Sequence, residues 1–175
     1  YASAWLKVHY PAAFYAGLLA SQPMGFYSPQ SLTSDARRRK VVIGHPCINR
    51  SETKSVVENM GEEAGFGVRL GLDSVRGIGQ DLADKIVVER RSRGPFHRIG
   101  DLSNRIGLSD RQLEALASAG AFDVLGVERR SALWAAGAAA HSGPQTLPGL
   151  EIGVAAPELA ALSPVEKTVS EIWAT

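Results

Sequence analysis

The sequence is short of the residues that build disulfide frameworks and metal centres. Its 175 residues include one cysteine, Cys47, and four histidines that are scattered without the spacing of metal ligands. A single cysteine cannot form a disulfide within the chain. We therefore expect no metal site in this chain, and we interpret Cys47 as a small buried side chain in a reducing, cytoplasmic compartment.

Long apolar runs are also missing. No run reaches the roughly 18 residues that a membrane-spanning helix requires, and the first residues lack the basic and apolar regions of a signal peptide. We therefore expect no membrane partner. The chain starts without Met and stops within an apolar stretch, which we interpret as two cuts within a larger protein.

Neither sign of charge dominates, because 19 Lys and Arg face 18 Asp and Glu. The distribution is uneven, however: residues 1–50 carry six basic residues against one acidic residue, and residues 67–130 carry eleven against nine. Positive charge concentrated in two segments is compatible with binding a polyanion such as DNA, although it does not require one.

Hydrophobic periodicity and breakers predict a mainly α fold with a small α/β segment. Pro11 and Pro29 suit the first turns of two helices, the second capped by Ser28 and ending at Arg38. A strand at 41–43 should pair with one at 68–70, with a helix at 51–59 between them. The other helices that we expect lie at 72–75, 80–91, 101–106, 113–117 and 127–138, the last anchored by Leu133 and Trp134.

The most informative stretch runs from Leu72 to Ile86 and is centred on Gly77-Ile78-Gly79. A tight Gly-apolar-Gly turn followed by Ala83 and Ile86 at helical spacing is the pattern of a helix-hairpin-helix motif. Glycine tolerates positive φ and close approach of another backbone, so we expect positive φ at both glycines. The free N–H groups at the start of the following helix form an anion site, usually filled by a DNA phosphate.

We therefore predict a contact with the DNA backbone that carries no base-sequence information. The alternative is an αα-hairpin whose glycines only make a turn. A second, degenerate copy spans 99–125, with its pivot at Gly107-Leu108-Ser109, and its role is either packing or DNA contact. We predict no catalytic residues and no metal ligands, and the predicted DNA-binding residues are Arg76, Gly77, Ile78, Gly79, Lys85, Arg90 and Arg91.

Several segments resemble bacterial C-family DNA polymerases, the family of the DNA polymerase III α subunit, and in particular its error-prone branch. They are Trp5 to Phe14, Ser21 to Pro29, Pro46 to Ser51, Val68 to Leu72, Arg76 to Gly79, Arg93 to Phe96, Leu116 to Asp123 and Trp173 to Thr175. The chain departs from the family at Cys47, where an Asp is usual.

The resemblance implies a domain order. Residues 1–66 would be the last part of the polymerase fingers, and 67–138 a tandem helix-hairpin-helix DNA-binding domain. Residues 139–165, rich in Ala, Gly, Pro and Ser, would be a linker, and 166–175 the truncated start of an OB domain. The catalytic palm, with its carboxylates and Mg²⁺, would lie outside this chain, so this part should be inactive alone.

The resemblance also implies a role in damage-induced mutagenesis and translesion synthesis, with duplex or primer-template DNA and accessory mutagenesis proteins as partners. Two other interpretations stay open. One is a non-enzymatic DNA-binding adaptor or repair factor that uses the same hairpins. The other is a protein-interaction scaffold whose basic faces dock an acidic partner.

Overall fold

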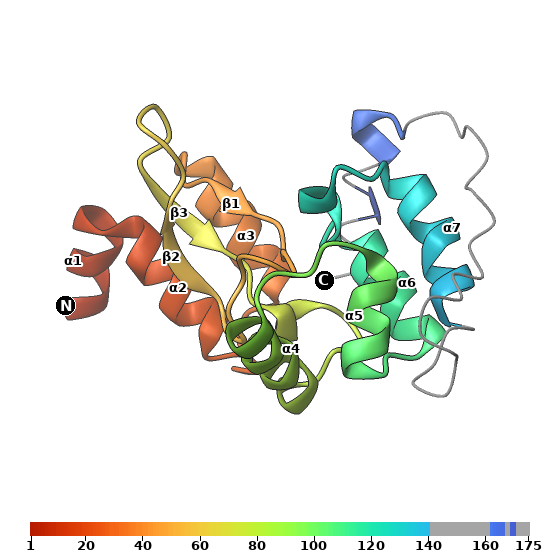
Figure 1. The fold of residues 1–175 in the computed structure, drawn as a ribbon. Helices are drawn as coiled ribbons and strands as arrows, with labels where there is room; N and C mark the ends of the chain where they lie inside the picture. Colours follow the sequence, from red (N-terminus) through yellow and green to blue (C-terminus); the bar gives the residue numbers. More distant parts are fainter. Residues whose placement is uncertain (141–161, 167–168, 171–175) are drawn as a thin grey trace.

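The computed structural model describes residues 1–140, 162–166 and 169–170. Their fold is mainly helical with one small sheet, as predicted (Figure 1). Most of the predicted linker at 139–165 lies outside the described residues, as does most of the predicted OB start. The elements are α1 (Ala2–His9), α2 (Pro11–Ala20), α3 (Pro29–Arg38), β1 (Ile43–Gly44), β2 (Val56–Asn59), β3 (Phe66–Arg69), η1 (Leu72–Ser74), α4 (Gln80–Arg93), α5 (Ile99–Ile106), α6 (Asp110–Ser118), η2 (Asp123–Leu125) and α7 (Arg129–Ala140).

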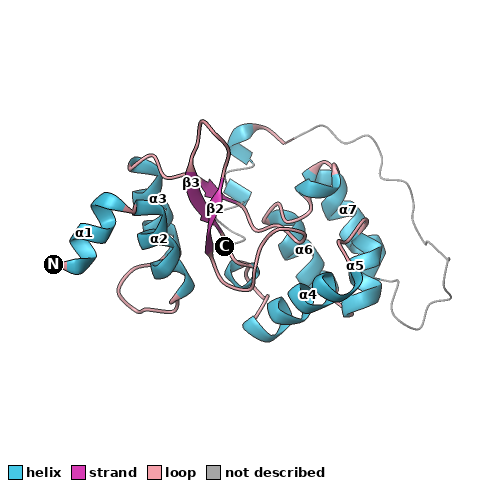
Figure 2. Ribbon diagram, turned by 60° about the vertical axis from the view of Figure 1, so that its left-hand side comes forward, coloured by secondary structure: helices cyan, strands magenta, loops and turns pink. Residues whose placement is uncertain are grey.

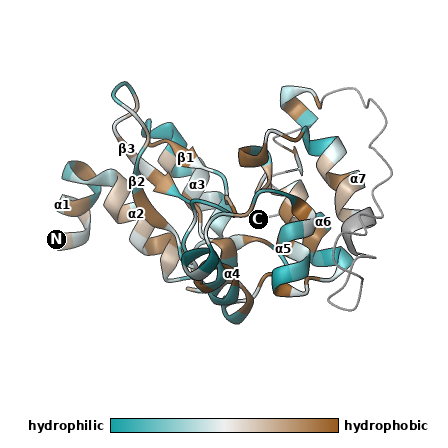
Figure 3. Cartoon of the chain, in the orientation of Figure 1, coloured by the Kyte–Doolittle hydropathy of each residue, from teal (hydrophilic) through white to brown (hydrophobic). Residues whose placement is uncertain are grey.

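The first three helices pack beside the sheet at one end of the molecule, and α5–α7 form the other end (Figures 1 and 2). The predicted cap of α3 is present, because the Ser28 hydroxyl accepts a hydrogen bond from the N–H of Ser31 at 3.2 Å. Buried side chains of α2 and α3, among them Tyr15, Leu19 and Leu32, form a core with Val68 of β3. Figure 3 shows α2 in the colours of apolar residues and α4 mostly in those of hydrophilic ones.

The sheet confirms one strand pairing and corrects one helix. Its order is β1-β3-β2, with Ile43 opposite Val68 in a parallel pair and β2 antiparallel to β3. The helix predicted at 51–59 is wrong: its first half is loop and its second half is β2. Ser51 does not cap a helix, because its hydroxyl accepts from the N–H of Cys47 and donates to the Leu70 carbonyl. Its side chain instead ties this loop to the end of β3.

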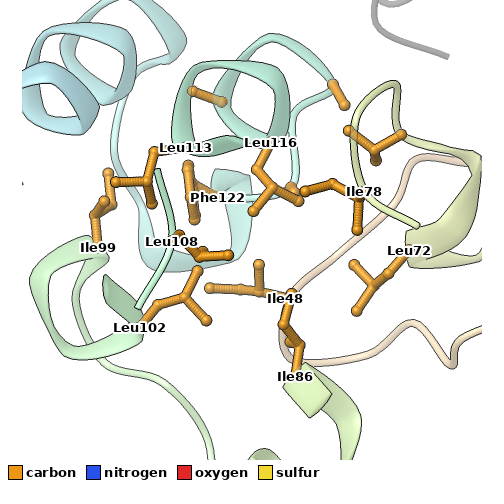
Figure 4. Close-up of a cluster of buried hydrophobic side chains, with 14 of the residues drawn as sticks. Ile48, Leu72, Ile78, Ile86, Ile99, Leu102, Leu108, Leu113, Leu116 and Phe122 are labelled. Carbon is orange, nitrogen blue, oxygen red and sulfur yellow. The ribbon is translucent and has the colours of Figure 1, made fainter. Parts of the chain in front are cut away.

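A second hydrophobic core unites the elements from η1 to α7 (Figure 4). Ile48, from the loop before β2, lies within it between Leu72 and Ile86 on one side and Leu102 and Leu108 on the other. This loop is fastened further by Asn49, whose amide exchanges two hydrogen bonds of 2.8 Å with the backbone of Phe96. The core around the hairpins therefore includes a residue from before position 67.

Of the two apolar anchors predicted for α7, one is wrong. Leu133 is partly buried against the core as predicted, but Trp134 is 48% exposed. Ala132 and Ala136 of α7, one helical turn apart, are fully buried. Small side chains let α7 approach its neighbours closely, so the helix presents its alanines inward and turns the bulky indole outward.

Two further features of the described residues bear on the sequence analysis. None of their helices combines the length and the apolar character needed to cross a membrane. Within the predicted OB start at 166–175, the structure describes residues 166, 169 and 170, and these are helical.

Candidate nucleic-acid interface

The first hairpin is built by a short helix, a sharp turn and a long helix. Gly77 has φ +83°, a conformation open to glycine and costly for other residues. Ile78 follows with 2% of its surface exposed and fills the space between η1 and α4. Ala83 and Ile86 on α4 are fully buried against the same core. The hairpin predicted from these residues is thus present.

Gly79 corrects the expectation of two positive φ angles. It is the N-cap of α4 with φ −72° and ψ 168°, extended backbone that any residue adopts. A Cβ added there would meet no atom within 4 Å. Within the described residues, the N–H groups of Gly77 and Gly79 donate to no protein acceptor. Gly79 therefore leaves the N-terminus of α4 accessible and is not needed to relieve backbone strain.

The second hairpin repeats the first with different residues. Gly107 ends α5 in the left-handed region at φ +76°, and Leu108 is buried like Ile78. Ser109 then caps α6 with φ −78° and ψ 161°, close to the angles of Gly79. The degenerate copy expected from the sequence is therefore a hairpin of the same backbone geometry.

The two hairpins differ at the cap itself. Ser109 and Gln112 form a capping box, in which the N–H of Ser109 donates to Gln112 Oε1 at 2.9 Å. The Ser109 amide is therefore occupied by the protein. The open amide groups at Gly77 and Gly79 have no such partner in the described residues.

Two of the predicted DNA contacts, Arg90 and Arg91, bond to other groups of the protein, and they differ in how far they are exposed. The Arg90 side chain is 10% exposed and donates to the carbonyls of Ile48 and Ser51 at 2.9 and 2.8 Å. Burial lowers the pKa of this guanidinium from its usual value, as expected for a cation removed from water. Arg90 therefore fastens the loop that carries Ile48, while the more exposed Arg91 pairs with Glu52 at 2.6 Å.

Lys85 is also held by the protein, because its ammonium donates to the Ile106 carbonyl at 2.8 Å. This bond joins α4 to the last turn of α5, where carbonyl groups lack helical partners. Its contact with DNA stays a prediction. The glycines, Ile78 and Arg76 lie together at the first turn as expected, whereas Arg90 and Arg91 lie toward the far end of α4.

A hollow of about 620 Å³ lies between the two hairpins. Arg76 and Gly77 line it from the first hairpin, and Ser109, Arg111 and Gln112 from the second. Arg111 was not among the predicted contacts. The sequence points to Arg111 only weakly, because its one distinguishing feature is that it is the first basic residue after the pivot Gly107-Leu108-Ser109. The other lining residues are Glu114, Ala115, Ser118 and Ser170.

Comparison with known families agrees with this geometry. The family model described as the helix-hairpin-helix motif matches residues 40–132, a range that contains both hairpins and the loop of Ile48. The chain belongs to the helix-hairpin-helix family. The match also begins well before the first hairpin, in keeping with the position of Ile48 in the hairpin core.

Relatives of this helix-hairpin-helix chain carry the name that the sequence resemblance suggested. The chain is 51% identical over 173 residues to an error-prone DNA polymerase of Mycobacterium bovis. The aligned part covers 99% of this chain and 16% of the relative. The corresponding proteins of Mycolicibacterium paratuberculosis and Corynebacterium diphtheriae are 52% and 47% identical over nearly the same span. The resemblance to the error-prone branch is confirmed, and the chain spans about 16% of the length of these relatives.

The described residues do not gather metal ligands. No group of three or more His, Cys, Asp and Glu side chains among them is placed to hold a metal ion. Asp81 and Asp84 are both exposed on α4, and Asp84 accepts a hydrogen bond from the Thr53 hydroxyl. These carboxylates therefore lack the convergent arrangement that two-metal nucleotidyl transfer uses.

Proposed function

We propose that this chain is the duplex-binding portion of an error-prone DNA polymerase. The observation that supports it is the tandem hairpin, with open amides at Gly77 and Gly79 and a hollow lined by arginines from both turns. Backbone amides and arginines bind phosphates, and two such contacts set apart on one surface suit a duplex backbone. Binding is therefore expected to be indifferent to base sequence.

The role of the longer protein forms part of the same proposal. Its relatives are named error-prone DNA polymerases, so we infer a DNA-directed polymerase that acts in damage-induced mutagenesis and translesion synthesis with accessory proteins. Mg²⁺ would serve nucleotidyl transfer in a palm domain outside this chain. This chain would hold primer-template DNA and would not extend a primer alone.

The test is a binding titration of the purified chain with duplex, primer-template and single-stranded DNA over a range of salt concentrations. We expect duplex and primer-template to bind with similar affinity for scrambled sequences. Arg76→Ala should weaken binding and reduce the slope of log affinity against log salt by about one unit. Arg37→Ala is the matched control, because Arg37 is exposed on α3, away from both hairpins.

Three outcomes would contradict the proposal. A chain that ignores DNA at low salt favours the scaffold interpretation. A strong preference for one duplex sequence contradicts backbone recognition. Magnesium-dependent primer extension by this chain would show that it contains a catalytic site. An adaptor or repair factor that uses the same hairpins is distinguished by the full-length protein, which would then lack polymerase activity.

A further inference from the structure

The second hairpin carries a cation, Arg111, that is not among the DNA contacts predicted from the sequence. We propose that Arg111 holds a DNA phosphate, so that the second hairpin grips the duplex through a side chain while the first uses backbone amides. This inference rests on the proposed function and assigns the phosphate contacts within it. Three observations support it: the pairing of the basic residues, the shared hollow and the capping box.

The first observation concerns which cations are already engaged. Among the basic residues from 67 to 130, only Arg76 and Arg111 have no partner within the described residues. Arg98 also has a partner. The remaining basic residues are engaged with carboxylates or backbone carbonyls: Arg69 with Glu58, Lys85 with Ile106, Arg90 with Ile48 and Ser51, Arg91 with Glu52, Arg93 with Glu89, Arg105 with Asp101, Arg129 with Asp123 and Arg130 with Glu166.

The second observation is where these two arginines lie. Arg76 precedes the first pivot and Arg111 follows the second, 35 positions later, yet both line the hollow of about 620 Å³ between the hairpins. An exposed arginine usually finds a carboxylate nearby or remains in solvent. Two unpaired guanidinium groups on one concave surface instead create a field that attracts an anion. Arginine suits phosphate because its planar fork donates two parallel hydrogen bonds.

The third observation explains why the second hairpin needs a side chain. The N–H of Ser109 donates to Gln112 Oε1 at 2.9 Å, so the position equivalent to Gly79 already has its acceptor. A phosphate at the second hairpin cannot use that amide without breaking the capping box. Arg111 lies two residues further along α6 and supplies a charged donor at the same end of the hollow.

Glu114 sets the strength of this contact. It lies one helical turn after Arg111 and lines the same hollow, and it forms no ion pair within the described residues. Its carboxylate repels a phosphate that approaches Arg111. The second hairpin should therefore bind more weakly than Arg111 alone would allow, and removal of the Glu114 charge should strengthen binding.

The experiment measures duplex affinity against salt for the purified chain and its Arg76→Ala, Arg111→Ala, doubly substituted and Glu114→Gln variants, each checked for folding by circular dichroism. Counterion release predicts that the loss of either arginine lowers the magnitude of the salt slope by about one unit, and the loss of both by about two units. One such contact corresponds to about eightfold in affinity between 1 M and 0.1 M salt. Glu114→Gln should raise affinity at low salt.

Matched controls separate a local contact from net charge. Arg37→Ala and Glu63→Gln change the same charges at exposed positions away from both hairpins, and neither should move the salt slope as far. If Arg111→Ala binds like the parent chain while Arg76→Ala does not, the assignment of Arg111 is overturned and the proposed function stands. Equal losses in Arg37→Ala and Arg111→Ala also overturn it. If the unaltered chain binds no duplex, the proposed function itself fails.

Discussion

Gly77 and Gly79 lie two positions apart in different regions of backbone conformation, at φ +83° and φ −72°. Both glycines belong to the Gly-apolar-Gly pattern by which the motif is identified in the sequence. Only Gly77 meets a conformational demand that other residues satisfy poorly. Gly79 has room for a side chain, so its value lies in the open amide that it offers.

This difference predicts that substitution of Gly77 costs more stability than substitution of Gly79. Gly77→Ala should lower the free energy of unfolding by about 1 kcal/mol, because alanine is strained at positive φ. Gly79→Ser should change it by less than about 0.5 kcal/mol, because serine is a good N-cap and its Cβ meets open space. Urea unfolding of the two variants measures both values. Equal losses would show that the two glycines share one role.

Arg90 and Arg91 are adjacent and chemically identical, yet the Arg90 side chain is 10% exposed and that of Arg91 66%. Arg90→Ala should cost about 3 kcal/mol, because it leaves the buried carbonyls of Ile48 and Ser51 without their donor. Arg91→Ala removes an exposed ion pair and should cost no more than about 1 kcal/mol. The free energies of unfolding of the two variants, measured by denaturant titration, test this prediction. A larger loss for Arg91→Ala than for Arg90→Ala would contradict it.

At the scale of elements, one carboxylate joins the first three helices. Asp35 on α3 accepts hydrogen bonds from Lys7 of α1, at 2.8 Å, and from the hydroxyl of Tyr15 on α2. The hydrogen bond from Lys7, followed by that from Tyr15, lowers the pKa of Asp35 to about 2. Arg39 adds a weaker ion pair at 3.7 Å. The carboxylate of Asp35 thus links α1, α2 and α3, which are consecutive in the sequence.

The depressed pKa of Asp35 predicts how stability depends on pH. A carboxyl whose pKa is lower in the folded state stabilises the fold above its unfolded pKa, near 3.8. That contribution is lost as the pH falls from about 4 to about 2. The difference in unfolding free energy between the parent chain and Asp35→Asn should therefore be constant above pH 5 and shrink over this window.

The partner provides the control for this pH effect. In a Lys7→Met background the largest cause of the pKa shift is gone, so Asp35→Asn should produce a smaller difference with a weaker pH dependence. Unfolding measured at a series of pH values gives both differences. The same pH profile in both backgrounds would show that Lys7 does not hold the pKa of Asp35 down.

For the whole molecule, the loop around Ile48 joins the two cores. Ile48 is fully buried among hairpin residues, its N–H donates to the Ala121 carbonyl, and its own carbonyl accepts from Arg90. The same loop continues into β2 of the sheet. The α/β part and the hairpins should therefore unfold together rather than as independent domains.

Ile48→Ala should consequently lower the free energy of unfolding by about 2–5 kcal/mol, because it opens a cavity in the hairpin core. The loss should appear in a single transition that circular dichroism and tryptophan fluorescence report alike. Val88→Ala, at an exposed position of α4, is the control and should change stability by less than about 0.5 kcal/mol. Two separate transitions in the parent chain would contradict this coupling.

Local features of this protein were open to prediction because they depend on residues close in sequence. The Ser28 cap, the positive φ at Gly77 and the capping box of Ser109 and Gln112 each involve positions within three residues of one another. Backbone sterics and hydrogen bonding at this range are set by residue type. The two hairpins, and with them the proposed DNA-binding role, follow from such local patterns.

The tertiary structure decided what depends on distant residues. The sequence gives no sign that Arg90 donates to the carbonyl of Ile48, 42 positions away, and its contact with DNA stays a prediction. Residues 56–59 form a strand because β3 provides a pairing edge for them, and β-branched valines suit that pairing. Arg111 became a candidate because the fold places it across a hollow from Arg76. Charge and propensity are properties of a residue, but burial and partners arise only when the chain folds.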